Sequence, residues 1–536
     1  MNRQFQDARR LPRLESTPSS VSVLELSSET ASTSNTTSQV RDNAGRLKRK
    51  AEEELPTDSS KSTAPATSLS SSSTIASASK RINKTYPRGG LRITRTPGRE
   101  KAKNCINLGD VIRKDHLVSA CIFSFWVAEE ELFPHLPLSL FRYSTSRDPN
   151  MDAMVQIACY RLRVTPKGKL TRKELATVES EAIRLHQQEH GGNLNTFYAR
   201  ASGCSHSKIL LLVYPTFLRI VITSCNMMDI DTEIGDNHWY IHDVPKLHTR
   251  SRHEPSSFEK DLLEHMEALN TPVEFLSSIR GTFDYSTVKV HLVTSIPGAH
   301  SGSKAQRHGL LRLRRVVNDL ELDLTSKQSS GELKLEVCAA SLGNLTAKWL
   351  NGFYRCALGR QSLEIENDLE MPDLKLFYPT IEDVQNAHMR AQTAASNIGC
   401  HIRGWDKAPS SLKGIFHHYR PKDTGWLFHQ KFILAYNPCN TSEAPYYVYI
   451  GSANLSQSAW GALERDKRGN EATHDTKLVK ISNFECGVVV PGHLIRDLLE
   501  PGTESWQNGL VPHLQTTEQY HPRNDIPWND PTWGKG

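Results

Sequence analysis

Apolar residues along this chain collect in short runs, and these runs alternate with stretches of helical pattern. Ala120–Trp126, Ile209–Tyr214 and Leu218–Thr223 are nearly unbroken apolar runs, as expected of strands that are covered on both faces. Between the first two, Arg172–Gln188 places leucine, valine and alanine three and four residues apart, which is typical of an amphipathic helix. The pattern therefore predicts alternating strands and helices, as in layered α/β proteins.

The same succession returns in the second half of the chain, from about residue 297. Helices are predicted at Leu310–Leu320 and Thr346–Leu358. Strands are predicted at Leu333–Ala339, Lys431–Tyr436, Tyr446–Ile450 and Phe484–Val490. We therefore expect two α/β domains, residues 106–296 and 297–536, preceded by a separate N-terminal segment.

The first 105 residues have the composition of a disordered tail. Between Thr57 and Ser79, 14 of 23 residues are serine or threonine, so this stretch has too few apolar groups to offset the entropy of ordering. A basic cluster at Arg46–Lys50 fits a nuclear import signal and, equally, a solvated run of charge. We expect residues 1–105 to be a disordered, basic tail rich in serine and threonine.

Charge and apolar content narrow the class of protein. The 536 residues carry a net charge of +6, to which residues 1–105 contribute +9 and the remainder −3. A nucleic acid would therefore have to meet a local basic groove on the folded part. No apolar run reaches the roughly 18 residues that span a bilayer, and the polar N-terminus does not resemble a secretory leader.

Cysteine usage points to a reducing, intracellular compartment. The ten cysteines are never closer than 16 positions, so neither a disulfide framework nor a cysteine-based zinc motif is indicated. Carboxylate or Cys/His clusters at metal-ligand spacing are not recognised either. We expect a soluble protein that needs no metal and no cofactor.

Two short segments more than two hundred residues apart carry the same polar residues. Each has a histidine, a lysine two positions on and a later asparagine: His206, Lys208 and Asn226, and then His429, Lys431 and Asn454. Side chains at i and i+2 of a strand point to the same face, so each pair sets an imidazole beside an ammonium. We interpret this as a duplicated unit whose two copies meet around one phosphate-binding site.

These side chains suit phosphodiester chemistry. Imidazole titrates near pH 6.5, so one ring can attack phosphorus in its neutral form while the other protonates the leaving oxygen. The second ring can then deprotonate the water that cleaves the phosphohistidine. The lysines would hold the charge on the phosphate oxygens, and the asparagines would add amide donors. A lone histidine at a strand start is more often structural, but two complete units in the same order are hard to obtain by chance.

The two segments resemble the H-x-K motifs of the phospholipase D superfamily, and Gly451–Asn454 resembles its G-S-x-N element. Members usually have an aspartate five residues after the lysine, whereas this chain has Val213 and Tyr436. In this respect the chain is similar to the tyrosyl-DNA phosphodiesterase branch. Within residues 106–536, further stretches resemble that family: Ile106–Pro137, His291–Gly298, Ala340–Gly343, Tyr378–Thr380, Ile450–Gly461, Asn483–Val489 and Asp525–Trp528.

The resemblance implies roles for the site residues. His206 would be the nucleophile and His429 the general acid and then the base, while Glu485 would orient a catalytic imidazole. The phosphate would be gripped by Lys208, Lys431, Asn226 and Asn454. Further substrate contacts are implied for Ser456, Ser341 and Asn237, although the serines also suit plain turn positions. Asn237 stands where the family has a supporting glutamine, and Ser202 where it has a base-stacking aromatic residue.

The resemblance also implies fold and reaction. The fold would be α/β, with two similar phospholipase D-like α-β-α domains related by a pseudo-twofold and the active site at their interface. The reaction would split the bond between a DNA 3′-phosphate and a tyrosine left by topoisomerase I, leaving a 3′-phosphate. Expected partners are single- and double-stranded DNA with blocked 3′ ends and the topoisomerase peptide, in a monomeric nuclear protein. Arg403–Tyr419 is either a rim for such a substrate or a solvated loop.

Two other functions stay open at this point. A superfamily phosphodiesterase that acts on phospholipid or ordinary DNA would be expected to have aspartate at positions 213 and 436 and a lipid-facing apolar segment. A scaffold that binds DNA ends without cutting them would be expected to have lost a histidine or a lysine. The sequence meets neither expectation.

Overall fold

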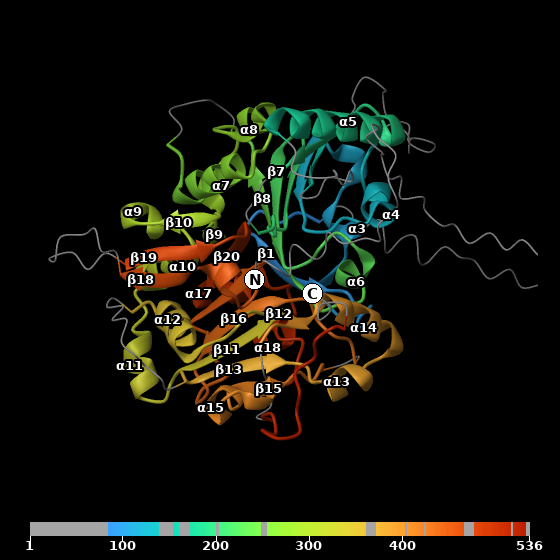
Figure 1. Ribbon diagram of the computed structural model, residues 1–536. Helices are drawn as coiled ribbons and strands as arrows, with labels where there is room; N and C mark the ends of the chain where they lie inside the picture. Colours follow the sequence, from blue (N-terminus) through green and yellow to red (C-terminus); the bar gives the residue numbers. More distant parts are fainter. Residues whose placement is uncertain are drawn as a thin grey trace, which may run out of the picture.

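The computed structural model describes residues 84–138, 154–159, 171–199, 203–247, 254–360, 371–402, 405–422, 425–465, 476–515 and 518–531. Residues 1–83 of the predicted tail lie outside these ranges, and so do the basic cluster at Arg46–Lys50, Ser202 and Arg403. The described part forms two halves, each built on a large β-sheet with helices around it (Figure 1).

The first large sheet has eight strands in the order β2-β1-β8-β7-β6-β3-β4-β5. Along the chain these are β1 (Gly90–Thr94), β2 (Cys105–Ile106), β3 (Ser119–Phe123), β4 (Met154–Cys159), β5 (Leu194–Tyr198), β6 (Ile209–Val213), β7 (Phe217–Thr223) and β8 (His238–Pro245). The second has seven strands in the order β15-β13-β11-β16-β17-β20-β9. These are β9 (His291–Ser295), β11 (Lys334–Ala339), β13 (Leu374–Tyr378), β15 (Phe416–His418), β16 (Lys431–Tyr436), β17 (Tyr447–Gly451) and β20 (Glu485–Pro491).

Helices and two small sheets complete the fold. The helices of the first half are α3 (Leu108–Val111), α4 (Glu129–Leu132), α5 (Arg172–His190), α6 (Asp229–Thr232), α7 (Ser257–Ala268) and α8 (Val273–Ile279). Those of the second are α9 (Gly302–Ala305), α10 (Gly309–Asp319), α11 (Leu324–Ser329), α12 (Ala347–Ala357), α13 (Ile381–Gln385), α14 (Met389–Ala394), α15 (Ser410–Lys413), α16 (Gln457–Trp460), α17 (Gly492–Leu498) and α18 (Trp506–Leu510). The small sheets are β10 (Gly298–His300), β19 (Thr476–Ile481) and β18 (Ala462–Arg465), and β12 (Ser341–Leu342) with β14 (Gly399–Cys400). Among the described residues, no helix combines the length and the apolar content needed to cross a membrane.

The two large sheets repeat one pairing scheme. From the β5 edge to β1, successive neighbours pair as two parallel and then four antiparallel pairs. From the β15 edge to β9, the same series of parallel and antiparallel pairs recurs. The predicted α/β class with two similar halves is confirmed.

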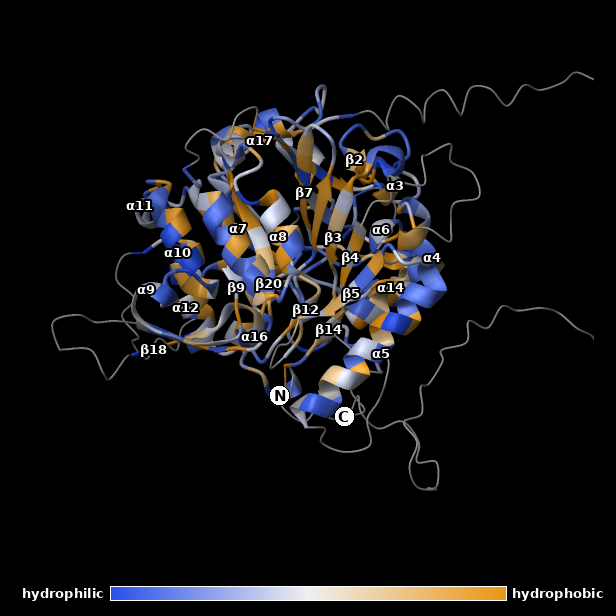
Figure 2. Ribbon diagram, turned by 90° about the horizontal axis from the view of Figure 1, so that it is seen from above, coloured by the Kyte–Doolittle hydropathy of each residue, from blue (hydrophilic) through white to orange (hydrophobic). Residues whose placement is uncertain are grey.

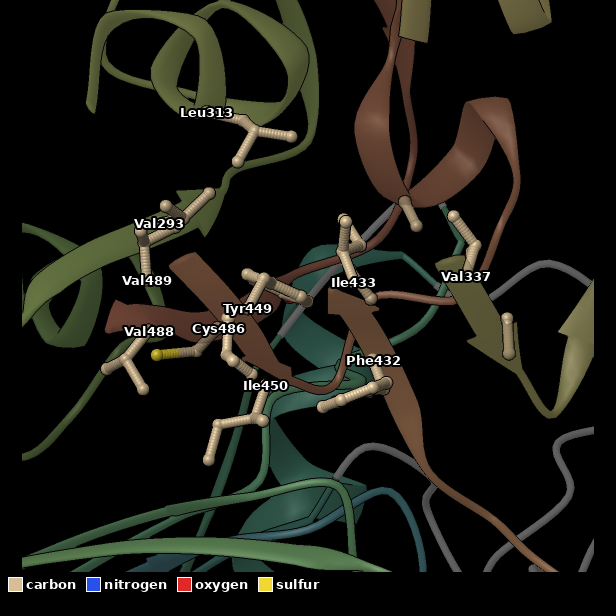
Figure 3. Packing of buried hydrophobic residues seen from close by; sticks show 14 of the residues in the cluster. Val293, Leu313, Val337, Phe432, Ile433, Tyr449, Ile450, Cys486, Val488 and Val489 are labelled. Atoms are coloured by element: carbon tan, nitrogen blue, oxygen red, sulfur yellow. The ribbon is translucent and has the colours of Figure 1, made fainter. Parts of the chain in front are cut away.

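The strands are buried as their unbroken apolar runs indicated. In β6, Ile209 and Leu211 face one apolar cluster, whereas Leu210 and Leu212 face a second cluster on the other side of the sheet. In Figure 2 these strands are mostly hydrophobic and lie between amphipathic helices. The first cluster continues into the second half, where Figure 3 shows side chains of β9, β11, β16, β17 and β20 packed together. One core therefore joins the halves.

The predicted domain boundaries at 105/106 and 296/297 each cut off the first strand of a half. β1 lies inside the first sheet between β2 and β8, and β9 is the edge strand of the second sheet, paired with β20. β1 escaped prediction because it lies in a basic stretch that was interpreted as tail. Arg92 of β1 is nevertheless buried, with Nη1 donating to Leu498 O at 2.8 Å and Nη2 bound to the Glu500 carboxylate at 2.7 Å. Arg92 and Arg99 of this basic stretch are therefore interior residues, whereas Arg88, Lys101 and Lys103 are exposed.

Candidate active site

Each His-x-Lys segment is held by a loop of the opposite half. His206 and Lys208 lie directly before β6, and the backbone N–H of His206 donates to Phe484 O at 2.9 Å. His429 precedes β16, which begins with Lys431, and its N–H donates to Asp236 O at 3.0 Å. These contacts place both histidines at the junction of the two sheets, as the pseudo-twofold predicted.

The asparagines follow equivalent strands. Asn226 comes three residues after the end of β7, and Asn454 three after the end of β17. Ser224 and Ser452, two residues earlier, accept hydrogen bonds from the N–H groups of His238 and Cys486, at 3.0 and 2.9 Å. The turn geometry is therefore duplicated along with the strands.

Glu485 holds His206, as the resemblance implied. Its Oε2 lies 2.8 Å from His206 Nδ1 and accepts a hydrogen bond from Ser452 Oγ at 2.5 Å. Asn483 Nδ2 donates to the other carboxylate oxygen at 3.1 Å. A carboxylate on Nδ1 favours the tautomer in which Nδ1 carries the proton, which leaves the Nε2 lone pair available for bond formation.

Asp231 has the corresponding position beside His429, and the sequence analysis missed it. Its Oδ2 lies 2.8 Å from His429 Nδ1 and accepts a hydrogen bond from Asn226 N at 2.7 Å. Asn397 Nδ2 donates to the other oxygen at 3.3 Å. Ala459 occupies the equivalent position after Asn454, so a comparison of the two halves gave no signal. The available signal was an acid in the turn after an expected site asparagine.

Asn237 lies one layer behind the site and not against a substrate position. It follows Asp236 as Glu485 follows Phe484, so the predicted correspondence with Glu485 holds in the fold. Its amide, however, is fully buried, accepts from Ser224 Oγ at 2.7 Å and donates to Asp231 O at 3.0 Å. Asn237 therefore positions Asp231 and does not form the substrate contact that the resemblance implied.

Lys208 and Lys431 are completely buried. Lys208 Nζ donates to His206 O at 2.9 Å, and Lys431 Nζ donates to His429 O and, across the halves, to Ser224 O at 3.3 Å. Burial lowers the pKa of Lys208 to about 8. Burial and repulsion from Lys208 lower the pKa of Lys431 well below its usual value. A bound anion opposes both shifts, so the pair favours a negatively charged ligand.

Burial also lowers the pKa of both imidazoles. That of His206 falls to about 4 and that of His429 to about 3, because desolvation outweighs the adjacent carboxylates and the lysines add to it. Both rings are therefore neutral near pH 7 in the substrate-free site, where the sequence analysis expected one to be protonated. The negative charge of a phosphodiester would raise the pKa of both rings.

The remaining predicted contacts surround the asparagines. Asn454 Oδ1 accepts from Ser341 N at 3.0 Å, and Ser456 caps α16 by accepting from Ala459 N at 3.3 Å. Asn226 Oδ1 has no hydrogen-bond partner among the described residues, so this buried amide keeps bonding capacity for a ligand. Both serines are half-buried and remain predictions as substrate contacts.

The end of the predicted rim at Arg403–Tyr419 is interior, whereas most of residues 406–411 are exposed. His417 and His418 form part of β15 and are buried, and His418 contacts the carboxylates of Asp383 and Asp525, both at 3.0 Å. Tyr419 is also buried and donates to Asp236 Oδ2 at 3.0 Å. His417, His418 and Tyr419 therefore form neither a substrate rim nor a solvated loop, and the rim stays a prediction for the mostly exposed residues 406–411.

An aromatic side chain beside the nucleophile position was not recognised from the sequence. The Phe125 ring lies edge-on to His206 with ring centroids 5.3 Å apart, and Lys208 Nζ is 5.8 Å from the Phe125 centroid. The residue follows β3 at the end of a run that was interpreted as strand alone. Its ring fixes one side of the imidazole.

Two repeated α/β halves each contribute one His-x-Lys pair to a shared site, which is the arrangement that the resemblance to the phospholipase D superfamily implied. The family model described as tyrosyl-DNA phosphodiesterase matches residues 91–530, and the chain belongs to this family.

The individual relatives are also described as tyrosyl-DNA phosphodiesterases. The chain is 27% identical over 300 residues to "Tyrosyl-DNA phosphodiesterase 1" of Arabidopsis thaliana, which is 54% of this chain and 46% of that protein. It is 22% identical over 416 residues to a probable tyrosyl-DNA phosphodiesterase of Caenorhabditis elegans, 75% of this chain and 82% of that protein. The crystal structure of the yeast tyrosyl-DNA phosphodiesterase superposes with a TM-score of 0.54 at 15% identity, covering 82% of this chain and 99% of that one. The match thus spans about half the length of the Arabidopsis protein, and the yeast structure supports the fold.

Proposed function

We propose that this protein hydrolyses the phosphodiester bond between a DNA 3′ end and a tyrosine. The observation that carries the proposal is the pairing of each histidine Nδ1 with its own carboxylate, Glu485 for His206 and Asp231 for His429, both at 2.8 Å. Two oriented imidazoles that share a site with two buried lysines suit an in-line displacement at phosphorus. Family membership supports the choice of substrate.

In the first step, His206 Nε2 forms a bond to phosphorus and the bond between phosphorus and the tyrosine oxygen breaks. His429 donates a proton to that oxygen, which leaves as tyrosine. His429 acquires this proton when the bound phosphodiester raises its low pKa. Lys208, Lys431 and the asparagine amides stabilise the charge on the phosphate oxygens.

In the second step, neutral His429 takes a proton from a water molecule as its oxygen bonds to phosphorus. The bond between phosphorus and His206 Nε2 then breaks. DNA leaves with a 3′-phosphate, and both rings return to their starting states once His429 loses its proton to solvent. Chemistry through these residues requires no metal ion.

The test is cleavage of a labelled single-stranded oligonucleotide with a 3′-phosphotyrosine, in buffer with EDTA. We expect release of a 3′-phosphate product and loss of turnover in His206→Ala. A folded protein that binds the oligonucleotide without cutting it would support the scaffold, and cleavage of phospholipid alone would support a lipase.

The biological setting forms part of the same proposal. We propose that the adducts are those left by topoisomerase I, that the enzyme acts as a monomer, and that it works in the nucleus. The basic cluster at Arg46–Lys50 supports nuclear import. The test is to replace this cluster by alanine in a fluorescent fusion. Loss of nuclear accumulation would support the import signal, and unchanged accumulation would refute it.

A further inference from the structure

A second group of histidines and carboxylates lies in the first half, outside the proposed phosphodiester site. The last turn of α5 reads His186-Gln187-Gln188-Glu189-His190. Residues four apart lie on the same face of a helix, and the His186 and His190 rings are 5.9 Å apart between centroids. His190 is buried, and its ring packs edge-on against Phe133 at 4.7 Å.

Glu129 approaches both rings from the neighbouring helix. It is the first residue of α4, which lies beside α5 in both views (Figures 1 and 2). One carboxylate oxygen is 2.9 Å from His190 Nε2, and the other is 3.9 Å from His186 Nε2. Glu189 Oε2 lies 3.5 Å from the same His190 nitrogen. Ligand atoms of Glu129, Glu189 and His190 all fall within 4.8 Å of one another.

These separations match those of ligands around one zinc ion. Zinc bonds to imidazole nitrogen or carboxylate oxygen of about 2.0–2.1 Å place tetrahedral ligand atoms about 3.3 Å apart. The separations of 2.9 and 3.5 Å from His190 Nε2 to Glu129 and Glu189 lie on either side of that value.

We propose that Glu129, Glu189 and His190 bind one divalent cation of the zinc type, with water or His186 as a further ligand. The cation would tie the end of α5 to the start of α4. Because α4 begins four residues after Phe125, whose ring contacts His206 at 5.3 Å, the cation would brace the segment that borders the phosphodiester site. It would take no part in the chemistry at phosphorus.

The sequence did not predict this site, because its residues include no cysteine and do not form a compact cluster along the chain. Glu189 and His190 are adjacent, but Glu129 lies 60 positions before Glu189. A hydrogen bond from His190 Nε2–H to Glu129 would give the same 2.9 Å distance without a cation, and the experiment separates these two arrangements.

The first measurement uses the tag-free full chain after treatment with a chelator and buffer exchange. Titration with Co²⁺, a spectroscopic substitute for Zn²⁺, is expected to give visible d–d bands that saturate at one equivalent and disappear when Zn²⁺ is added. Zn²⁺ is expected to raise Tm, since a ligand that binds only the folded state stabilises it. No saturable band and no change in Tm would overturn the proposal without the need for any variant.

Variants then locate the cation. Glu129→Gln and His190→Asn are each expected to weaken binding at least about tenfold, as loss of one of three protein ligands should. The matched control is His116→Ala, an exposed histidine of the same half, which should bind as the unchanged chain does. Binding that survives in both site variants, or that is lost in His206→Ala instead, would show that the cation sits elsewhere.

Turnover gives an independent readout. Below Tm, the chelator-treated protein is expected to cleave the phosphotyrosyl oligonucleotide at its normal rate, because the cation is remote from phosphorus. A loss of turnover that Zn²⁺ restores would contradict the purely structural role.

Discussion

At the scale of single residues, the two halves position their histidines by different means. Glu485 stands at the start of β20 and reaches His206 directly, whereas its counterpart Asn237 is an amide that bonds Ser224 and Asp231. The carboxylate for His429 comes from α6 in the form of Asp231. The two halves therefore repeat the same backbone arrangement, but the carboxylate that contacts each histidine comes from a different position.

Asp231→Asn tests this assignment. Loss of the negative charge removes the interaction that supports a protonated His429, so kcat should fall about 10²-fold or more. The optimum of a kcat against pH profile should move to lower pH, because Asp231 raises the pKa of His429 in the folded protein. Glu233→Gln, an exposed change one residue beyond α6, is the matched control and should leave both quantities unchanged. An unaltered profile in Asp231→Asn would refute the positioning role.

His429→Asn separates the two chemical steps. The tyrosinate leaving group needs little protonation because phenol ionises near pH 10, so the first step should continue slowly while activation of water is lost. A covalent adduct of protein and DNA should accumulate and migrate as a shifted band on a denaturing gel. A folded variant without adduct would mean that His429 is not the hydrolytic base.

Lys208 should set an alkaline limit on activity. Its pKa of about 8 implies that the free enzyme loses a positive charge as the pH rises through that value. With substrate held far below KM, we expect kcat/KM to fall as the pH rises through about 8 and Lys208 loses its proton, and loss of the proton of Lys431 adds to the fall. A rate that stays constant up to pH 9.5 would contradict the assignment.

At the scale of elements, the clearest patterns in the sequence predicted strands β3, β6, β7, β11, β16, β17 and β20 and helices α5, α10 and α12. Helix α5 begins at the predicted Arg172, since the side chain of Thr171 accepts from Glu174 N and the Glu174 carboxylate accepts from Thr171 N. The other strands of the large sheets were not predicted. In β1, β4, β5, β8, β9, β13 and β15, polar residues interrupt the apolar run. The paired motifs identified six of the candidate site residues. Asp231 offered one signal, an acid in the turn after Asn226, but the sequence does not show that it reaches His429, and only the folded chain brings Phe125 to His206.

Arg99→Met examines the segment that follows β1. The Arg99 guanidinium forms a buried ion pair with Asp236, whose backbone oxygen accepts from His429 N. Removal of one member of a buried pair leaves a charge without its partner and should cost about 3–5 kcal/mol of unfolding free energy. Urea denaturation measures this cost, with Lys101→Met at an exposed position as control. The double variant Arg99→Met/Asp236→Asn should recover a large part of the lost unfolding free energy. If the double variant is as unstable as Arg99→Met alone, the ion pair between Arg99 and Asp236 does not explain the loss.

At the scale of the whole molecule, buried histidines make the fold sensitive to acid. Burial lowers the pKa of His206 and His238 to about 4 and that of His265, His308 and His429 to about 3. An unfolded chain protonates such rings near pH 6.5. Stability is therefore fully present above about pH 6.5 and is lost as the pH falls toward 4, because the unfolded state then binds more protons.

The expected result is a decrease in unfolding free energy between pH 7 and 5.5, where most carboxylates are still ionised. Each histidine with a strongly lowered pKa contributes up to about 1.4 kcal/mol per pH unit in this range. Urea denaturation at both pH values measures the change, and His265→Asn should make it smaller. A free energy that is the same at pH 7 and 5.5 would contradict the burial of neutral imidazoles.

The interior contacts of β1 also set the order of events during synthesis. Arg92 bonds to Leu498 O, 406 positions later, and Asn104 Nδ2 donates to Gly509 O, 405 positions later. Helices α17 and α18 likewise pack against β1. At about 5–20 residues per second, a ribosome needs roughly 20–80 s to make the intervening chain. The earliest strand of the fold must therefore wait on the nascent chain, with part of its cover missing, until synthesis has almost finished.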